Sequence, residues 1–332
     1  MLAMVFDRFG EPDVMQLRDV PVPKAQEGEV LIRVCYSGVN PADSKRRARH
    51  TARGGYPVSL PFVVGRDAAG VVERTAQNVT EFRRGDRVIT WGSGDGKTWG
   101  SYAEFVRVSV RNVAPMPHSL NFAQAAALPI ASLTAFQSLF HAENGGMIPG
   151  QKVLINGAAG GVGSFAVQFA KSGGLLVAAT CRTDNVAYVR SLGADRVIDY
   201  KTEDVCRAVR DWSAEGVDVV LDAVGPATLP QALDMLRPGG RLINILTVTA
   251  DGDTERDRAE AERRDFRKIV TLIDFERARE SMREITNLVD RGLVHVPPID
   301  VLPLWDAARA HQMIDTGHVR GKLVLNVAEL PT

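Results

Sequence analysis

The chain has 332 residues, of which 45% are hydrophobic and 24% charged, so it is long enough for two cores of ordinary size. Its 40 basic and 40 acidic residues cancel, which leaves no net field to attract nucleic acid or an anionic membrane. Three widely spaced cysteines, Cys35, Cys181 and Cys206, argue against a disulfide framework and favour a reducing cytoplasm. Neither a signal peptide nor an apolar run of the ~18 residues that a membrane-spanning helix needs is recognisable. We therefore expect a two-domain cytoplasmic protein.

The first 120 or so residues contain short strand-like segments broken by Gly, Pro and Asp, at residues 30–34, 69–72 and 87–89. This pattern predicts an antiparallel β domain. An Ala-rich helical stretch, residues 122–127, then marks a change of texture. We expect the domain boundary there.

Beyond this stretch, strands and helices alternate. The strands are short and almost wholly apolar, as strands buried on both faces of a parallel sheet must be: residues 152–155, 175–178, 217–221 and 241–243. They predict a doubly wound parallel sheet. The charge-rich stretch 251–268 is expected to be a solvated helix, and residues 321–325 a strand that returns to the first domain.

The most informative segment is residues 152–163, in which a strand runs into a glycine-rich turn and then a helix. A dinucleotide requires a tight turn, close approach of the backbone to its pyrophosphate, and a helix N-terminus with free N–H groups. Gly160 and Gly163 meet the last two needs, whereas Ala158 stands where the usual pattern has its first glycine. Because the turn lies between a strand and a helix, we interpret it as a dinucleotide site rather than a structural turn.

The end of the next strand indicates which dinucleotide binds. Enzymes that use NAD place an acid there, against the ribose 2′-hydroxyl. This chain has Arg182 instead, whose guanidinium suits a 2′-phosphate, and we expect NADPH. The alternative is that Arg182 is a surface residue and the nearby Asp184 serves NAD.

Further motifs follow one another along the chain: GVNPAD (residues 38–43), GRDAAG (65–70), GDRV (85–88), GSYAE (100–104), ALP (127–129) with Thr134 and Ala135, AAGGVG (158–163) and RGK (320–322). In this order they resemble the quinone oxidoreductases, the zinc-free, zeta-crystallin-like family of the medium-chain dehydrogenase/reductase superfamily. The resemblance spans essentially the whole chain. It implies an α/β protein with a GroES-like β-rich catalytic domain, residues 1–123 and 270–332, and a Rossmann NADPH-binding domain, residues 124–269.

The same resemblance bears on metal binding. The catalytic cysteine and the histidine ligand of zinc alcohol dehydrogenases align with Asn40 and Arg66, and neither can replace a thiolate or an imidazole on zinc. No cysteine lies between Cys35 and Cys181, so the structural-zinc loop is also missing. The six histidines, including His141, show no spacing suited to a metal. We expect a metal-free protein.

Without a Lewis acid, conjugate hydride transfer to a quinone or an α,β-unsaturated carbonyl is the favoured reaction. The cofactor-binding residues expected from the turn and from the resemblance are Asn40, Thr134, Ala158, Gly160, Gly161, Val162, Gly163, Arg182, Tyr200, Ile245, Thr247 and Lys322. Asn40, Tyr56 and Tyr102 are the candidate catalytic residues by location. Tyr102 is more often a packing residue in such a motif, and protonation from solvent is equally plausible.

Two rival functions remain open at this stage. The basic run at residues 45–50, Lys-Arg-Arg-Ala-Arg-His, would suit a trans-acting enoyl reductase for carrier-bound acyl chains, although a solvated loop is the simpler interpretation. The second rival is a non-catalytic NADPH-binding module. Residues 266–273 are expected to form an edge strand that pairs across a two-fold axis, which predicts a homodimer.

Overall fold

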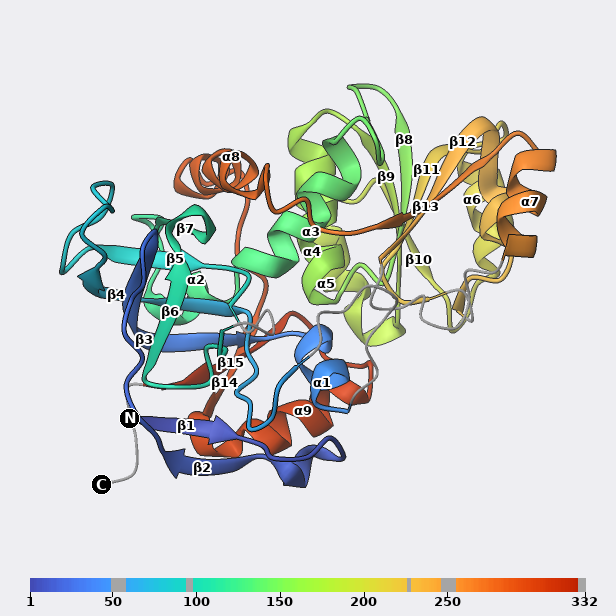
Figure 1. Ribbon diagram of the computed structural model, residues 1–332. Helices are drawn as coiled ribbons and strands as arrows, with labels where there is room; N and C mark the ends of the chain where they lie inside the picture. The colour runs from blue at the N-terminus through green and yellow to red at the C-terminus, as the bar shows by residue number, and fades with distance from the viewer. Residues whose placement is uncertain (49–57, 94–97, 226–227, 246–254, 328–332) are drawn as a thin grey trace. The chain divides into compact units, whose positions relative to one another are not determined.

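The computed structural model describes residues 1–48, 58–93, 98–225, 228–245 and 255–327 (Figure 1). The chain divides into two compact units. The first combines Met1–Ala131, Phe275–Arg291 and Val296–Thr332, and the second combines Ser132–Asp274 with Gly292–His295. The first division falls later than the expected residue 123, because the Ala-rich helix α2 (Phe122–Ala126) packs on strands of the first unit. The second falls after Asp274 and not after residue 269.

The first unit is β-rich. Its strands are β1 (Leu2–Val5), β2 (Gln16–Asp19), β3 (Glu29–Val39), β4 (Asp67–Thr75), β5 (Arg87–Thr90), β6 (Phe105–Ser109), β7 (Val113–Pro115), β14 (Ile299–Pro303) and β15 (Lys322–Asn326). Besides α2, its helices are α1 (Pro41–Arg47), α8 (Ala278–Asp290) and α9 (Ala307–Asp315).

Seven of these strands form one sheet, in the order β14-β15-β3-β4-β5-β7 with β6 also paired to β3. All its pairs are antiparallel except β14 with β15. Strand β15, near the C-terminal end of the chain, lies against β3, so the return of residues 321–325 to the first domain is confirmed (Figure 1). The inward side chains of β1, β3, β4 and β6 join those of β15 and α9 in one apolar core.

The second unit alternates strands and helices. Its elements are α3 (Pro129–Phe140, which begins in the first unit), β8 (Lys152–Asn156), α4 (Gly161–Ser172), β9 (Leu176–Cys181), α5 (Val186–Ser191), β10 (Arg196–Asp199), α6 (Val205–Trp212), β11 (Val217–Asp222), β12 (Leu236–Ile245), α7 (Glu255–Arg263) and β13 (Arg267–Thr271).

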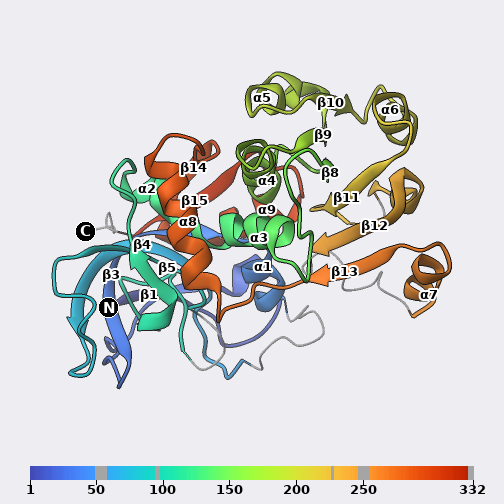
Figure 2. The same cartoon turned by 90° about the horizontal axis from the view of Figure 1, so that it is seen from above.

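All six strands of this unit are parallel, in the order β10-β9-β8-β11-β12-β13. Figure 2 shows α4 on one face of the sheet, with α6 and α7 on the other. The doubly wound α/β architecture is therefore confirmed. The strand order reverses between β8 and β11, and such a reversal opens a crevice at the carboxyl ends of the strands where ligands bind.

Two sequence expectations concern the edge of this sheet. Strand β13 lies at the edge, as predicted, and the charge-rich stretch before it contains α7.

The short segment Gly292–His295 belongs to the second unit, because Gln168 of α4 hydrogen-bonds both the N–H and the C=O of His295, at 2.8 and 3.0 Å. Among the described residues, no helix is long and apolar enough to cross a membrane.

Candidate functional site

The glycine-rich turn follows β8, one of the two strands beside the reversal of strand order. Gly157 has φ +81°, a left-handed conformation that side chains other than glycine rarely adopt, so the residue before Ala158 supplies the tight turn. A Cβ on Gly163 would lie 2.2 Å from the Gly157 carbonyl oxygen, which means that helix and turn are packed too closely for any side chain. A Cβ on Gly160 would meet only one atom, at 3.5 Å. The backbone is therefore open beside Gly160.

Helix α4 begins at this open position. Gly160 is its N-cap residue and provides no side chain to cap the first N–H groups. Such groups at a helix N-terminus, together with the helix dipole, form a site for an anion. The turn therefore fits the pyrophosphate of a dinucleotide, and Gly160 leaves open the space that a Cβ would fill.

A buried polar network, which was not predicted from the sequence, contacts the turn at the Gly157 N–H. The Gly157 N–H donates to Thr180 Oγ1 at 3.1 Å, Thr180 donates to Asn156 Oδ1 at 2.7 Å, and Asn156 Nδ2 donates to Asp222 Oδ1 at 2.9 Å. Asn244 Nδ2 donates to the other carboxylate oxygen of Asp222 at 3.1 Å. The signal in the sequence was a polar residue at or near the end of each of four apolar strands, where a parallel sheet brings those ends together.

Arg182 and Tyr200 follow the carboxyl ends of the neighbouring strands β9 and β10. The Arg182 side chain is 42% exposed and lies 4.0 Å from the carboxylate of Asp184, which is 84% exposed. No carboxylate belongs to the end of β9 itself. The placement leaves Arg182 available to a ligand, and its contact with a 2′-phosphate stays a prediction.

The remaining predicted cofactor residues of this unit that the structure describes lie in α3, β12, the glycine-rich turn and α4. Thr134 is half-buried in α3, and Ile245 is the buried last residue of β12. Ala158 is buried within the turn, whereas Gly161 and Val162 are half-buried in the first turn of α4. Thr247 lies outside the described residues. The cofactor roles of these residues stay predictions.

In the first unit, Asn40, Asp67 and Lys322 meet at one end of three adjacent strands, β3, β4 and β15. Lys322 Nζ donates to Asn40 Oδ1 at 2.6 Å and to the Val39 carbonyl at 2.9 Å. Asn40 Nδ2 donates to Asp67 Oδ2 at 2.9 Å, and that oxygen lies 3.9 Å from the ammonium. All three side chains are nearly inaccessible, at 3%, 0% and 5% exposure. Asp67 was not among the site residues predicted from the sequence, although it lies in the GRDAAG motif.

Burial sets the protonation behaviour of these groups. It raises the pKa of Asp67 to about 6, an effect that the Lys322 charge and the Asn40 hydrogen bond oppose. Burial likewise lowers the pKa of Lys322, against the attraction of Asp67 and Asp43. Asp43 is itself buried and has a raised pKa for the same reason. The network therefore holds one cationic side chain beside two carboxyl groups in a place that is nearly inaccessible to water.

The two tyrosines predicted as catalytic candidates differ in what the structure describes. Tyr102 is completely buried, and its hydroxyl lies 3.1 Å from Nε2 of His311. Burial raises the pKa of Tyr102 and lowers that of His311 to about 3. This environment favours the packing interpretation of Tyr102 over a proton donor. Tyr56 lies outside the described residues.

The basic run is not the solvated loop that we expected. Lys45, Arg46 and Arg47 form the last turn of α1, and Arg46 and Arg47 are buried. Arg47 donates to Ser44 and to Asp315 of α9, which draws its guanidinium into the unit. Arg49 and His50 lie outside the described residues. The described part of the run therefore presents fewer charges to a partner than its sequence suggests.

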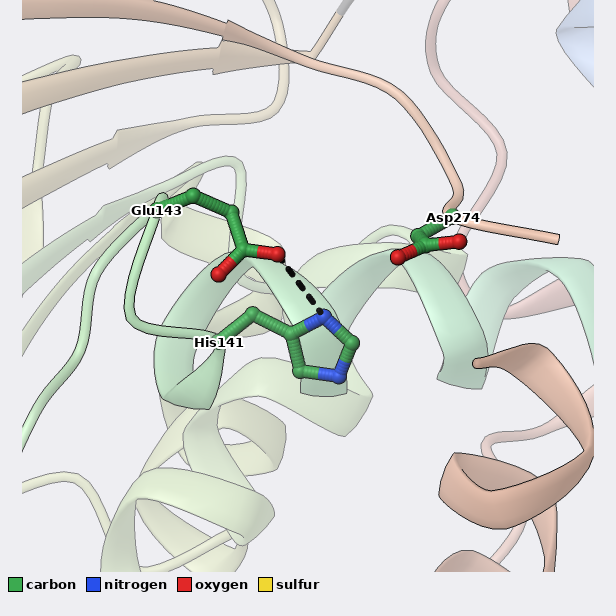
Figure 3. A group of neighbouring side chains, drawn as sticks. All are labelled: His141, Glu143 and Asp274. Atoms are coloured by element: carbon green, nitrogen blue, oxygen red, sulfur yellow. Dashed lines mark ion pairs between the residues drawn. The ribbon is translucent and has the colours of Figure 1, made fainter. Parts of the chain in front are cut away.

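One group of metal-type donors occurs among the described residues, and it lies in the second unit (Figure 3). His141 and Glu143 follow α3, and Asp274 follows β13. Their ligand atoms all lie within 4.8 Å of one another, with 4.0 Å between His141 Nδ1 and Glu143 Oε1. Spacing along the sequence could not reveal this group, because Asp274 is far from the other two residues in the chain. Asn40 and Arg66, which stand in place of the zinc ligands, belong to the other unit.

Comparison with known proteins agrees with this architecture. The sequence matches two protein-family models, the alcohol dehydrogenase GroES-like domain over residues 26–118 and zinc-binding dehydrogenase over residues 192–325. It is 33% identical to an NADPH-dependent alkenal/one oxidoreductase, chloroplastic, of Arabidopsis thaliana, over 98% of this chain and 79% of that one. It is 31% identical to a quinone oxidoreductase of Rattus norvegicus, over 98% and 97%. A solved quinone oxidoreductase from Coxiella burnetii superposes with a TM-score of 0.86 at 33% identity, over 98% and 99%.

A GroES-like unit formed by both ends of the chain, with a doubly wound dinucleotide-type sheet inserted, defines the medium-chain dehydrogenase/reductase superfamily. Within it, the chain belongs to the quinone oxidoreductase family, as the resemblance of its motifs predicted.

Proposed function

We propose that the protein is an NADPH-dependent reductase that transfers a hydride to a quinone or an α,β-unsaturated carbonyl compound. The observation that carries the proposal is the glycine-rich turn, with its open backbone at Gly160 and the α4 N-terminus behind it. Relatives named as NADPH-dependent alkenal/one oxidoreductase and quinone oxidoreductase support the cofactor and the substrate class.

In this mechanism the bound cofactor supplies the hydride, and the protein supplies binding and orientation. The N–H groups of the first turn of α4 bind the pyrophosphate, and Arg182 pairs with the 2′-phosphate. Asn40 offers its amide to the carboxamide of the cofactor or to the substrate. The conjugated system of a quinone or enone spreads the charge that develops on its oxygen, so no strong acid is needed at the site.

We propose further that catalysis needs no zinc. Asn40 stands where a thiolate ligand would be required, and its Oδ1 already accepts a hydrogen bond from an ammonium group at 2.6 Å. A second cation at that oxygen would be repelled by Lys322 at short range and low dielectric. Activity should therefore survive exhaustive treatment with a strong chelator, and its loss, followed by recovery with Zn²⁺, would contradict this part of the proposal.

The test of the reaction is NADPH oxidation with 1,4-benzoquinone and with a simple enone, followed by absorbance, beside the same assay with NADH. We expect NADPH to be consumed and NADH to be much poorer. In Arg182→Ala the preference for NADPH over NADH should fall by about 10- to 100-fold. This is the factor that corresponds to the loss of one charge-assisted hydrogen bond, which contributes about 1.5–3 kcal/mol. Arg190→Ala, at an exposed arginine of α5, is the matched control and should keep the preference.

Other outcomes of this assay would refute parts of the proposal. Tight NADPH binding without turnover of any quinone or enone would show that the protein is a non-catalytic NADPH-binding module. An unchanged NADPH preference in Arg182→Ala would remove the assigned role of that arginine. Turnover confined to carrier-linked acyl substrates, with a steep dependence on salt, would favour the enoyl reductase.

A homodimer that pairs through the free edge of β13 is the assembly that we propose. Support comes from the edge position of β13 and from Leu272, which directly follows it and is 61% exposed. Leu272→Lys should shift the protein from dimer to monomer in sedimentation velocity. Leu293→Lys, at a 47% exposed leucine of the same unit, should leave the dimer intact. A wild-type monomer at micromolar concentration would contradict the proposal.

For the compartment we propose a reducing cytoplasm. It is supported by the three cysteines, which are all free thiols in the structure. Recovery of the protein in the soluble cytosolic fraction, with all three thiols reactive after denaturation, is the expected result. Recovery with oxidised thiols from an exported fraction would contradict it.

A further inference from the structure

The buried contacts around Asn40 assign a role to two residues that do not themselves need to touch a ligand. We propose that Lys322 and Asp67 are a positioning pair, which fixes the side-chain amide of Asn40 in one orientation and strengthens it as a hydrogen-bond donor. This inference rests on the proposed function, in which Asn40 faces the cofactor or the substrate.

The first step concerns the orientation of the amide. Lys322 can only donate hydrogen bonds, and an ionised Asp67 can only accept them. With Oδ1 toward Lys322 at 2.6 Å and Nδ2 toward Asp67 at 2.9 Å, both contacts of Asn40 are charge-assisted hydrogen bonds. A flipped amide would place its NH₂ group against the ammonium and its oxygen against the carboxylate. Because these groups are almost fully buried and water can do little to relieve those contacts, the flipped state is strongly disfavoured.

The backbone leaves the side chain little other freedom. The Asn40 N–H donates to Asp43 Oδ2 at 2.9 Å, and the Asp43 N–H donates to the Asn40 carbonyl at 2.9 Å, which fixes Asn40 as the N-cap residue of α1. Asp67 is held in turn by the N–H of Ile130, which donates to its Oδ1 at 3.0 Å. Each end of the amide is therefore tied to a group that is itself anchored.

Asn40 keeps one side-chain N–H that can donate to a ligand. The contacts above use one hydrogen of Nδ2 and one lone pair of Oδ1, so one N–H remains. A cation on Oδ1 draws electron density from the amide and makes the remaining N–H a better donor, since linked hydrogen bonds polarise one another. Asn40 is thus suited to hold a carbonyl oxygen as a neutral donor and not to release a proton.

The same geometry gives Lys322 an indirect role. Its ammonium group has three donors and faces the Val39 carbonyl, Asn40 Oδ1 and the Asp67 carboxylate, at 5% exposure. In this arrangement the lysine acts on the site through Asn40 rather than through a phosphate. Asp67 balances much of the buried charge, so removal of either partner alone leaves the other with weaker compensation.

The experiment compares Lys322→Met, Asp67→Asn and the double variant with the wild type. Arg107→Met is the matched control, because it removes a cation from a half-buried ion pair of the same unit, 3.4 Å from Glu29, without touching Asn40. The first readout needs no activity. In the ¹⁵N-labelled protein without cofactor, the two Asn40 side-chain amide hydrogens should be well separated in chemical shift, and the one bonded to Asp67 should be protected from exchange. Both features should be lost in Lys322→Met and kept in Arg107→Met.

The second readout separates positioning from a structural role. The double variant removes both charges of the pair, so its unfolding midpoint should recover most of what either single variant loses. Its kcat should nevertheless stay at least 10-fold below the wild type, while the Kd for NADPH changes by less than 3-fold. If kcat recovers together with stability, the pair serves folding only and the inference is overturned.

The failure of this inference can be told apart from the failure of the proposed function. If the wild type turns over no quinone or enone, the reductase assignment fails, yet the amide spectrum still decides whether the pair orients Asn40. If the wild type is active and the Asn40 amide signals of Lys322→Met match those of the wild type, the positioning pair is refuted while the reductase stands.

Discussion

Substitution by alanine should have opposite effects at Gly160, the N-cap residue of α4, and at Gly163 in its first turn. The first change should weaken NADPH binding and the second should lower stability. In Gly163→Ala the new methyl group would lie 2.2 Å from the Gly157 carbonyl oxygen and 2.7 Å from the Ala158 Cα, both backbone atoms that cannot rotate away. Helix α4 and the turn must then separate by about 1 Å. Overpacking of this kind costs about 1–3 kcal/mol, which the better helix propensity of alanine offsets by up to about 1 kcal/mol. We expect a net loss of about 2 kcal/mol in the free energy of unfolding.

In Gly160→Ala the nearest atom to the methyl group lies at 3.5 Å, an ordinary contact, and the residue already has a negative φ of −78°. Its stability should therefore stay within about 0.5 kcal/mol of the wild type, because the lower entropy of the unfolded chain roughly offsets the weaker N-cap. The methyl group does occupy the open space beside the backbone where we place the pyrophosphate. Binding of NADPH should weaken by at least 10-fold.

Urea unfolding of the protein without cofactor, together with NADPH titration by fluorescence, measures both effects. A Gly163→Ala protein that unfolds at the wild-type urea concentration would refute the packing argument. A Gly160→Ala protein that binds NADPH with wild-type affinity would show that the pyrophosphate lies elsewhere.

Three further predictions follow from the buried polar groups. Asp222→Ala leaves several buried donors without an acceptor and should lower the free energy of unfolding, measured in urea, by about 3 kcal/mol. A loss below about 1 kcal/mol would mean that the network is not cooperative. The Asp67 carboxyl should titrate near pH 6 in ¹³C NMR, because burial raises its pKa to about 6. Its contribution to stability is therefore fully present below about pH 4 and is lost as the pH rises through 6. A titration midpoint near pH 4 would contradict this. His311 stays neutral because burial, helped by the nearby Arg47 charge, lowers its pKa to about 3. Stability should therefore fall as the pH drops from about 6.5 toward 3, and His311→Gln should flatten that fall in acid unfolding.

The sequence determined the features that depend on local pattern. Apolar strands without alternation indicated a parallel sheet, and the glycines between a strand and a helix indicated a dinucleotide turn, because both depend on residues close together in the chain. The motifs along the chain also sufficed to identify the family. The basic run was misjudged for a complementary reason: its Arg47 pairs with Asp315, which lies on a distant segment.

Only the tertiary structure decided which polar residues act together. Asp67 and Lys322 begin two strands and Asn40 follows a third, and nothing in their local sequence shows that an ammonium and a carboxylate hold the two ends of one amide. Asp222 likewise supports the glycine-rich turn from another strand. The physical reason is that a buried charge is tolerated only beside its partner, and strand pairing, not sequence separation, sets which charges become neighbours.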